Sequence, residues 1–433
     1  MHRQFGTRWP ALLFAAVLLA ACALPSLPFQ LDPVVHLALE DYDRGYRQAI
    51  GTAPPEDHLE MVGQAMQKVE RLYVDDVDIP ALSQAALRGV IALPEADRVD
   101  PALTTAAING MLAELDPNTS YLPPEAYSAY LESIDGHYEG FGVRIRIDGD
   151  YVTIVNPIEG SPAAEIGLLA DDRITHIDGR ELIGLTLSEA VRQLRGPVDS
   201  TAVLAIERPS TAERFEVRLA RRAIEVAAVH HRIDGDVAYI QLARFNRTTV
   251  RGLDAAFDDI ERTLGARLCG IVLDMRDNPG GLVSAAVEVA DRFLERGAIL
   301  EVHGRAQSGQ RHLAAAGDRA DGKPVLVVMN RESASAAEIV AGALRYQSRA
   351  RVVGERSFGK GTMQVLQSLD NGGGMRLTTG RFSAGGGPSF DGKGIEPDIP
   401  FIADAQQGDD AFIGRIEATL PCQPLIAGRP AGE

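Results

Sequence analysis

Three short stretches hold the residue types that acyl transfer requires. Ser335 opens a run of small and apolar residues, Gly280 and Gly281 are adjacent, and Lys360 stands between two glycines. A serine hydroxyl becomes a nucleophile when a base removes its proton, and a neutral lysine amine can be that base. The bare N–H groups of a glycine pair can stabilise the resulting oxyanion. Together the stretches could supply a nucleophile, a base and an oxyanion site.

Each stretch has a simpler interpretation when it is taken alone. Ser335 followed by Glu338 three residues later is a capping-box pattern, and most such patterns only start a helix. A lysine between glycines is normally an exposed loop residue. Lys360 could act as a base only if burial lowered its pKa from about 10.4, the value in water. The chemical interpretation therefore depends on the elements that position the three stretches.

Two other motifs overlap the loop of Lys360. Residues 354–360 match the phosphate-loop pattern G-x-x-x-x-G-K, but Gly361 stands where a serine or threonine should bind magnesium. Ser357 and Lys360 match the Ser-x-x-Lys pattern of penicillin-binding enzymes, yet the glycines at 359 and 361 oppose the helix that this pattern needs. We reject both matches.

The flanking sequence predicts an α/β core over residues 223–405, followed by a weakly patterned tail over 406–433. A continuous apolar run that is typical of a buried strand occurs at Pro324–Met329, and two further strands are predicted at Val237–Leu242 and Gly270–Asp274. Helices are predicted to follow them at 250–264, at 282–293 and after Ser335. Ser335 and the glycine pair then both lie where a strand turns into a helix. The positive end of the helix would favour negative charge there.

Two further regions precede this core. Residues 22–137 are predicted to be mainly helical and include a turn at Leu115-Asp116-Pro117. Residues 138–222 read as short strands and two helices, in an order that resembles a PDZ domain of the bacterial protease type. In such domains a glycine-containing loop binds the C-terminal carboxylate of a peptide, which adds a strand to the sheet. The residues that match this loop are Gly140, Phe141, Gly142 and Val143.

The N-terminus predicts export and a lipid anchor. Arg3 and Arg8 precede the apolar run Ala11–Ala21, which is too short to span a bilayer and fits a secretory signal. The sequence Leu-Ala-Ala-Cys at 19–22 resembles a bacterial lipobox, so residues 1–21 would be removed and Cys22 would carry the lipid. Alanine at 23 favours the outer membrane. We expect a lipid-anchored protein of the bacterial cell envelope that faces the periplasm; an ordinary signal peptide is the alternative.

Composition narrows the classes of partner. The formal net charge is −17 and there is no basic block, which disfavours nucleic-acid binding. The nine histidines show no zinc-binding spacing, and we predict no metal site and no cofactor. Besides Cys22 there are two cysteines, Cys269 and Cys422, and the sequence leaves open whether they pair.

From about Leu59 to Ile399 the sequence resembles the C-terminal processing, or tail-specific, serine peptidases. The shared motifs are the Leu-Asp-Pro turn, the PDZ domain, DMRDNPGG at 274–281, Ser333–Leu344, Gly354–Gln364 and Gly392–Asp398. The resemblance implies a crotonase-like α/β peptidase core with an inserted PDZ domain. It assigns Ser335 as nucleophile, Lys360 as general base and Gln364 as the residue that orients the lysine. The oxyanion donors would be Ala336 and Gly280 or Gly281.

The chain departs from the family pattern at a few positions. Glu332 stands where a small residue is usual, Arg356 replaces a common proline, and Asp277 takes the place of a frequent asparagine. The segment Pro80–Val99 is longer than usual. These departures affect the expected access of substrate and leave the Ser–Lys pair intact.

The main hypothesis is an endopeptidase that binds protein C-termini through its PDZ domain and cleaves envelope proteins through an acyl-enzyme. A non-catalytic, membrane-tethered PDZ adaptor is the alternative, which the intact Ser335, Lys360 and Gln364 disfavour. A crotonase-like hydratase is suggested by fold alone. The sequence leaves open the substrate, an adaptor protein or homo-oligomer as partner, and whether the PDZ domain covers the cleft or delivers substrate.

Overall fold

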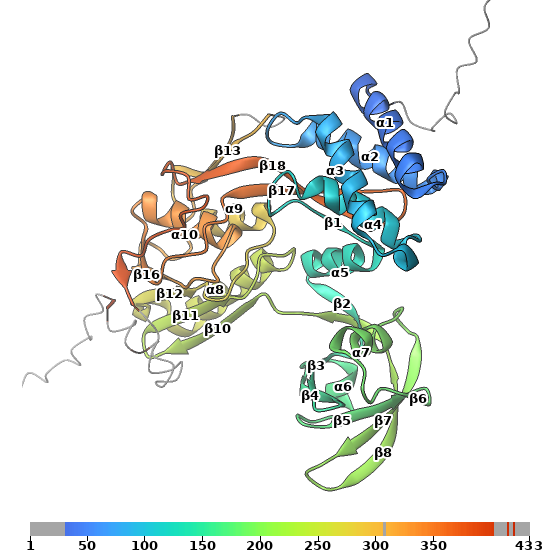
Figure 1. Ribbon diagram of the computed structural model, residues 1–433. Coiled ribbons are helices and arrows are strands. Elements are labelled where there is room, and N and C mark those ends of the chain that lie inside the picture. The colour runs from blue at the N-terminus through green and yellow to red at the C-terminus, as the bar shows by residue number, and fades with distance from the viewer. Residues whose placement is uncertain (1–30, 306–308, 402–413, 415–418, 421–433) are drawn as a thin grey trace, which may run out of the picture.

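The computed structural model describes residues 31–305, 309–401, 414 and 419–420. Separate hydrophobic clusters divide them into a helical N-terminal region, a β-rich domain and an α/β core. Figure 1 shows the core at the left, the helical region at the upper right and the β-rich domain at the lower right. The predicted fold class is confirmed. The predicted signal peptide, Cys22 and Cys422 lie outside the described residues.

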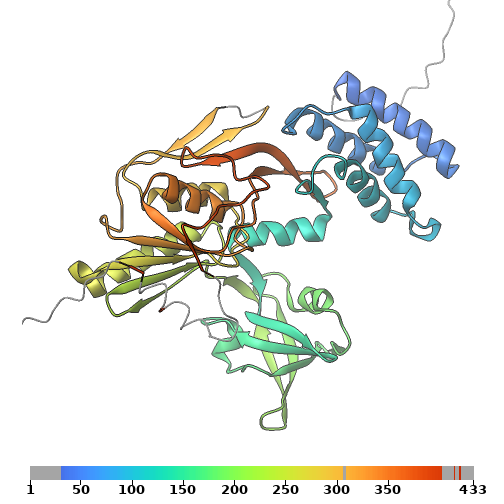
Figure 2. The ribbon, with the colours of Figure 1, turned by 60° about the vertical axis from the view of Figure 1, so that its left-hand side comes forward.

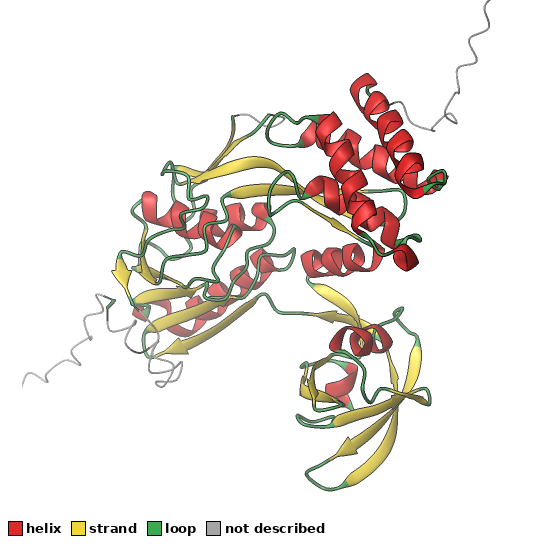
Figure 3. Cartoon of the chain, in the orientation of Figure 1, coloured by secondary structure: helices red, strands yellow, loops and turns green. Residues whose placement is uncertain are grey.

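The N-terminal region is a helical bundle that rests on a strand of the core. Its elements are α1 (Pro33–Ile50), α2 (Glu56–Leu72), α3 (Ile79–Ala92), the 3-10 helix η1 (Glu95–Asp97), α4 (Ala102–Leu112), β1 (Ser120–Leu122) and α5 (Pro124–Asp135). Apolar faces of α1–α4 form one cluster that also contains Leu369, Met375 and Leu377 from the core. Figure 3 shows how densely helices gather in this region. The bundle is therefore anchored on the core by hydrophobic packing.

The β-rich domain has the predicted PDZ order. Its elements are β2 (His137–Gly140), β3 (Val143–Asp148), β4 (Tyr151–Pro157), α6 (Pro162–Glu165), β5 (Arg173–Ile177), β6 (Arg180–Glu181), α7 (Leu187–Leu194), β7 (Thr201–Arg208), β8 (Glu213–Ala220) and β9 (Arg222–Glu225). The chain enters through β2 and leaves through β9, and these two strands pair antiparallel with His137 opposite Glu225. Figure 2 shows that this domain extends away from the core and the helical bundle.

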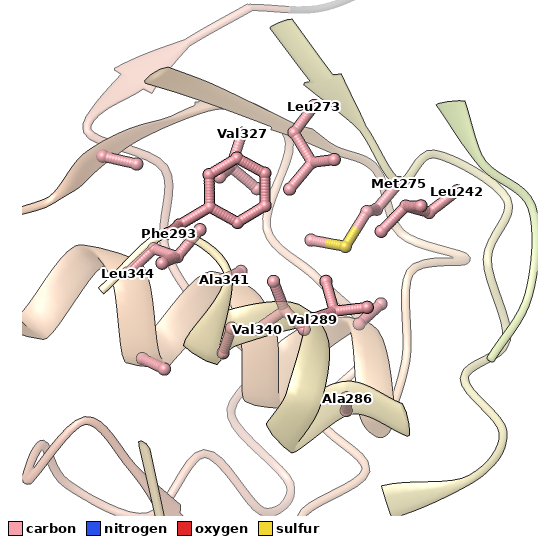
Figure 4. Packing of buried hydrophobic residues seen from close by; sticks show 14 of the residues in the cluster. Leu242, Leu273, Met275, Ala286, Val289, Phe293, Val327, Val340, Ala341 and Leu344 are labelled. Carbon is pink, nitrogen blue, oxygen red and sulfur yellow. The ribbon is translucent and has the colours of Figure 1, made fainter. Parts of the chain in front are cut away.

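The α/β core contains a six-stranded sheet. Its strands and helices are β10 (Val229–Asp234), β11 (Val237–Leu242), α8 (Thr249–Leu264), the 3-10 helix η2 (Gly265–Arg267), β12 (Gly270–Asp274), α9 (Val283–Asp291), β15 (Val325–Met329), α10 (Ala336–Tyr346), β16 (Ala350–Gly354) and β19 (Ile399–Pro400). The order is β10-β11-β12-β15-β16-β19, with only β10 antiparallel to its neighbour. Figure 4 shows Leu273 and Val327 of the sheet facing Val289 and Val340 of the helices.

A second sheet joins the core to the helical bundle. It contains β13 (Ala298–His303), β14 (Gln310–Leu313), β17 (Thr362–Ser368) and β18 (Gly374–Ala384), together with β1. The hairpin predicted around residues 371–374 is β17–β18, and β18 extends five residues beyond the predicted end at Thr379 to Ala384. The extra length lets β18 pair with β1, β13 and β17.

Two further features bear on the earlier predictions. Cys269 forms a disulfide, and its partner lies outside the described residues. Within the described ranges, no helix is long and apolar enough to cross a membrane.

Candidate active site

Three neighbouring parallel strands bring the candidate residues to one edge of the core sheet. β12, β15 and β16 lie side by side, and parallel strands end at the same edge. The loop after β12 holds Gly280 and Gly281, the loop after β15 holds Ser335, and the loop after β16 holds Lys360. Residues that are up to 80 positions apart are therefore adjacent because of the sheet topology.

Ser335 has a strained backbone at the start of α10. Its φ is +54° and its ψ is −110°, although it is not a glycine. Such conformations are rare for residues with a Cβ and persist where the surrounding structure holds them, often at functional sites. Ser335 is 8% exposed. The tight turn places this serine directly before the free N–H groups of the first turn of α10.

Gly280, the first residue of the glycine pair, lies directly against the serine. A Cβ built on Gly280 would lie 2.9 Å from Cβ of Ser335 and 3.0 Å from the backbone nitrogen of Ala336. The Gly280 N–H already donates to the side chain of Asn278 at 2.8 Å. For the N–H groups of Gly281 and Ala336, the described residues offer no acceptor. Of the predicted oxyanion donors, Gly281 and Ala336 are therefore the two whose N–H groups remain available.

Two buried side chains that we did not assign a role from the sequence tie these loops together. The Asn278 side chain donates from Nδ2 to the backbone carbonyl of Leu242 at 2.7 Å, and the Asn278 backbone carbonyl accepts from the Ala334 N–H at 2.9 Å. The Ser333 hydroxyl donates to the carbonyl of Met275 at 2.8 Å. Both residues lie within the motifs already noted, but only their long-range partners show what they do.

Glu338 connects the loop of Ser335 with the loop of Lys360. This fully buried carboxylate accepts from the backbone of Ser335 (2.8 Å), Gly359 (2.7 Å) and Lys360 (2.8 Å) and from the hydroxyl of Ser357 (2.6 Å). Ser335 and Lys360 bind the same oxygen, Oε2. Burial raises the pKa of Glu338, whereas the four donors favour its ionised form. The sequence identified Glu338 only as part of a cap.

The Lys360 amine lies in surroundings that favour its neutral form. Burial is the main reason that the pKa of Lys360 falls below its usual value, and the nearby positive charge of Arg376 lowers it further. The charges of Asp116 and Glu338 act in the opposite direction. Among the described residues, the Lys360 amine has no hydrogen-bond or ion-pair partner. Such a lysine is suited to accept a proton.

Gln364, which the family resemblance assigns to orienting the lysine, makes its hydrogen bonds to two threonines. If Lys360 and Gln364 lay on one strand, their spacing of four residues would put both side chains on the same side, but Lys360 precedes β17 and the register shifts between Met363 and Gln364. The Gln364 amide nitrogen donates to the hydroxyls of Thr362 (2.8 Å) and Thr378 (3.3 Å). No hydrogen bond joins Gln364 to Lys360 in the part of the chain that the structure describes.

The predicted peptide-binding loop lies on the PDZ domain. The carbonyls of Phe141 and Gly142 accept from the N–H groups of Ala163 (3.0 Å) and Ile158 (2.8 Å), so these carbonyls point into the domain. No described residue accepts from the N–H groups of Phe141 and Gly142. Beside the loop, β3 and α7 border a groove of about 300 Å³ whose lining includes Val143, Ile145, Leu187, Val191 and Leu194.

Comparison with known proteins places the chain in a family. Residues 236–401 match the model of peptidase family S41, and residues 153–208 match that of a PDZ domain. The carboxy-terminal-processing protease of Bartonella bacilliformis is 40% identical over 323 residues, which cover 73% of this chain and 74% of that protein. The chain belongs to peptidase family S41. The carboxyl-terminal-processing protease of Synechocystis is 36% identical over 303 residues. The matched residues cover 68% of this S41 peptidase and 70% of the Synechocystis protein.

A solved structure of a C-terminal processing protease is also similar to this chain. The photosystem II D1 C-terminal processing protease matches this S41 peptidase with a TM-score of 0.50 and 28% identity, over 81% of this chain and 94% of that one. The predicted family, fold class and enzyme class are confirmed: the chain is a serine-type protease with a PDZ domain. The hypotheses of a hydratase and of a non-catalytic adaptor are set aside.

Proposed function

We propose that this S41 peptidase is a lipid-anchored endopeptidase of the bacterial cell envelope, which recognises the C-termini of its protein substrates and cleaves them with a Ser335–Lys360 dyad. The pairing of Ser335 with Lys360 is supported by one observation. Ser335 lies in a strained turn against Gly280, and its backbone shares a carboxylate oxygen of Glu338 with the backbone of Lys360.

The chemistry follows from these positions. The neutral Lys360 amine takes the proton of the Ser335 hydroxyl as the Oγ atom attacks the peptide carbonyl. The N–H groups of Ala336 and Gly281 stabilise the oxyanion. Lys360 then returns the proton to the departing amine, which leaves the N-terminal part of the substrate as an ester on Ser335. Water, deprotonated by Lys360, hydrolyses the ester and restores the serine.

A covalent serine probe tests the nucleophile. The full chain is incubated with a fluorophosphonate, digested and mapped by mass spectrometry. The label is expected on Ser335, with none on its neighbours Ser333 and Ser357, and Ser335→Ala is expected to remain unlabelled. Labelling of another serine, or cleavage of an unfolded substrate by Ser335→Ala, would refute the assignment.

The PDZ loop supports recognition of a free C-terminal carboxylate. The unpaired N–H groups of Phe141 and Gly142 are donors for an anion, and the adjoining groove is lined mainly by apolar side chains. Blocking a substrate's C-terminus as an amide removes charge-assisted hydrogen bonds. We expect kcat/KM to fall by about 10- to 100-fold. Equal cleavage rates for the free acid and the amide would remove C-terminal recognition from the proposal.

A pair of matched leucines tests whether the groove carries this preference. Leu187 and Leu169 are both partly exposed on the PDZ domain (47% and 49%), but only Leu187 lines the groove. Leu187→Asp is expected to lose the preference for the free acid, and Leu169→Asp to keep it. A loss of the preference in both variants would point to general disruption of the domain.

The lipid anchor is tested by Cys22→Ser. We expect radiolabelled palmitate to enter the wild-type protein and not the variant, and the variant to leave the membrane fraction. Cleavage of residues 1–21 without any lipid on the wild type would favour an ordinary signal peptide instead.

A further inference from the structure

The turn at Asp116–Thr119 belongs to the helical N-terminal region, yet it reaches the strands that carry Gln364. The pairing of β1 with β18 brings it there. The Thr378 hydroxyl on β18 donates to Oδ1 of Asp116 at 3.2 Å, and Asn118 donates to the Thr362 hydroxyl at 3.2 Å. Thr362 and Thr378 are the two acceptors of the Gln364 amide.

The carboxylate fixes the direction of this chain of hydrogen bonds. An ionised carboxylate can only accept, so the single proton of the Thr378 hydroxyl is directed to Asp116. The oxygen of Thr378 is then left as an acceptor. The Thr119 hydroxyl lies 3.3 Å from it but makes its shorter bond, at 2.6 Å, to Asp116, so the NH₂ of Gln364 is the donor to Thr378. The amide plane is therefore set with its nitrogen toward the threonines. The carbonyl oxygen of Gln364 accepts no hydrogen bond from any described residue.

The turn itself is held firmly. Asp116 also accepts from the backbone of Asn118 (2.7 Å) and Thr119 (3.1 Å) and from the Thr119 hydroxyl (2.6 Å). Thr119 in turn accepts from the backbone of Thr378 at 3.1 Å. Because Thr378 and Thr119 are buried (1% and 6% exposed), water does not compete for these bonds.

We propose that Asp116, acting through Thr378, is a positioning residue that orients Gln364 so that its carbonyl oxygen is presented to the Lys360 amine. This inference rests on the proposed dyad. It assigns a role to the Leu-Asp-Pro turn. Through Asp116, the helical N-terminal region then contributes a positioning residue to the active site.

The electrostatic surroundings agree with this placement. Burial and the positive charge of Arg376 lower the pKa of Lys360, and the negative charges of Asp116 and Glu338 oppose this shift. Arg376 is fixed by the Ser120 hydroxyl at 2.8 Å and lies over the ring of Tyr130. Tyr73 is a further titratable group beside Asp116.

The test uses Thr378→Val, which removes the hydroxyl and keeps the shape, and Thr378→Ser, which restores the hydroxyl. Thr378→Val is expected to lower kcat by about tenfold with little change in KM, and Thr378→Ser to recover most of it. In a Gln364→Ala background, Thr378→Val is expected to cause no further loss of kcat, because the effect of Thr378 on the lysine is exerted through Gln364. Equal losses in both backgrounds, or no loss in Thr378→Val, would overturn the inference.

A pH profile gives an independent readout. Activity requires a neutral Lys360 and therefore rises with pH. Asp116→Asn removes a charge that raises the pKa of the lysine, so this rise is expected at lower pH than in wild type. An unshifted profile would contradict the proximity of Asp116 to the lysine. Activity in Lys360→Ala would refute the dyad itself, whereas an inactive Lys360→Ala beside an unaffected Thr378→Val would refute only the role of Asp116.

Discussion

Lys360→Ala is expected to abolish cleavage of an unfolded protein substrate while the protein remains folded. The alanine cannot take the proton of Ser335, and loss of a general base at a serine nucleophile lowers kcat by roughly 10³-fold or more. Folding should not suffer. Because the pKa of Lys360 is lowered in the folded protein, the unfolded chain binds more protons between that value and 10.5, so the buried lysine costs stability at neutral pH.

Lys393 provides the matched control. It is an exposed lysine whose backbone lies beside Gly359, and Lys393→Ala is expected to keep its activity. The measurements are substrate hydrolysis and thermal unfolding of both variants. In wild type, kcat/KM should rise with pH through a pKa below the usual lysine range. A folded Lys360→Ala protein with near-normal activity would exclude the lysine as the base.

Glu338→Ala is expected to be nearly as damaging, although Glu338 takes no part in proton transfer. The substitution leaves three buried donors and the partly buried N–H of Lys360 unpaired, and it releases the loops of Ser335 and Lys360 from each other. Misplacement of reacting groups by about 1 Å costs roughly 100-fold in rate, which sets the expected loss of kcat. The unpaired donors should also lower the free energy of unfolding by about 3 kcal/mol.

The control for this prediction is Glu332→Ala, an exposed carboxylate in the same loop. It removes a negative charge close to the site without removing a buried partner. Hydrolysis rates and chemical denaturation should separate the two variants clearly. Activity of Glu338→Ala within a few-fold of wild type would mean that the two loops hold their positions without this carboxylate.

Much of the arrangement at the sheet edge that carries Gly280, Ser335 and Lys360 was predictable, because it follows from local sequence patterns. The largely apolar segments at 237–242, 270–274 and 324–329 predicted β11, β12 and β15, within one residue of their observed ends. Since those strands are parallel and adjacent, the residues that follow them had to meet at one edge. The Ser-x-x-Glu pattern likewise predicted the first turn of α10.

The contacts between distant segments were not predictable in the same way. Glu338 reads as a helix cap, and only the return of the chain after β16 shows that it also binds the loop of Lys360. The position of Gln364 depends on a register shift in β17 that no sequence period reveals. Asp116 reaches Thr378 across 262 positions of the chain because β1 pairs with β18.

The paired strands at the entrance and exit of the PDZ domain make it an exchangeable module. Since His137 and Glu225 lie opposite each other in β2 and β9, the core meets the domain as a two-stranded ribbon whose ends are already adjacent. A foreign recognition domain with neighbouring termini could be joined at these two residues without stretching the core. Selection of substrates could thus be re-engineered, or could diverge between relatives, while the residues around Ser335 stay unchanged.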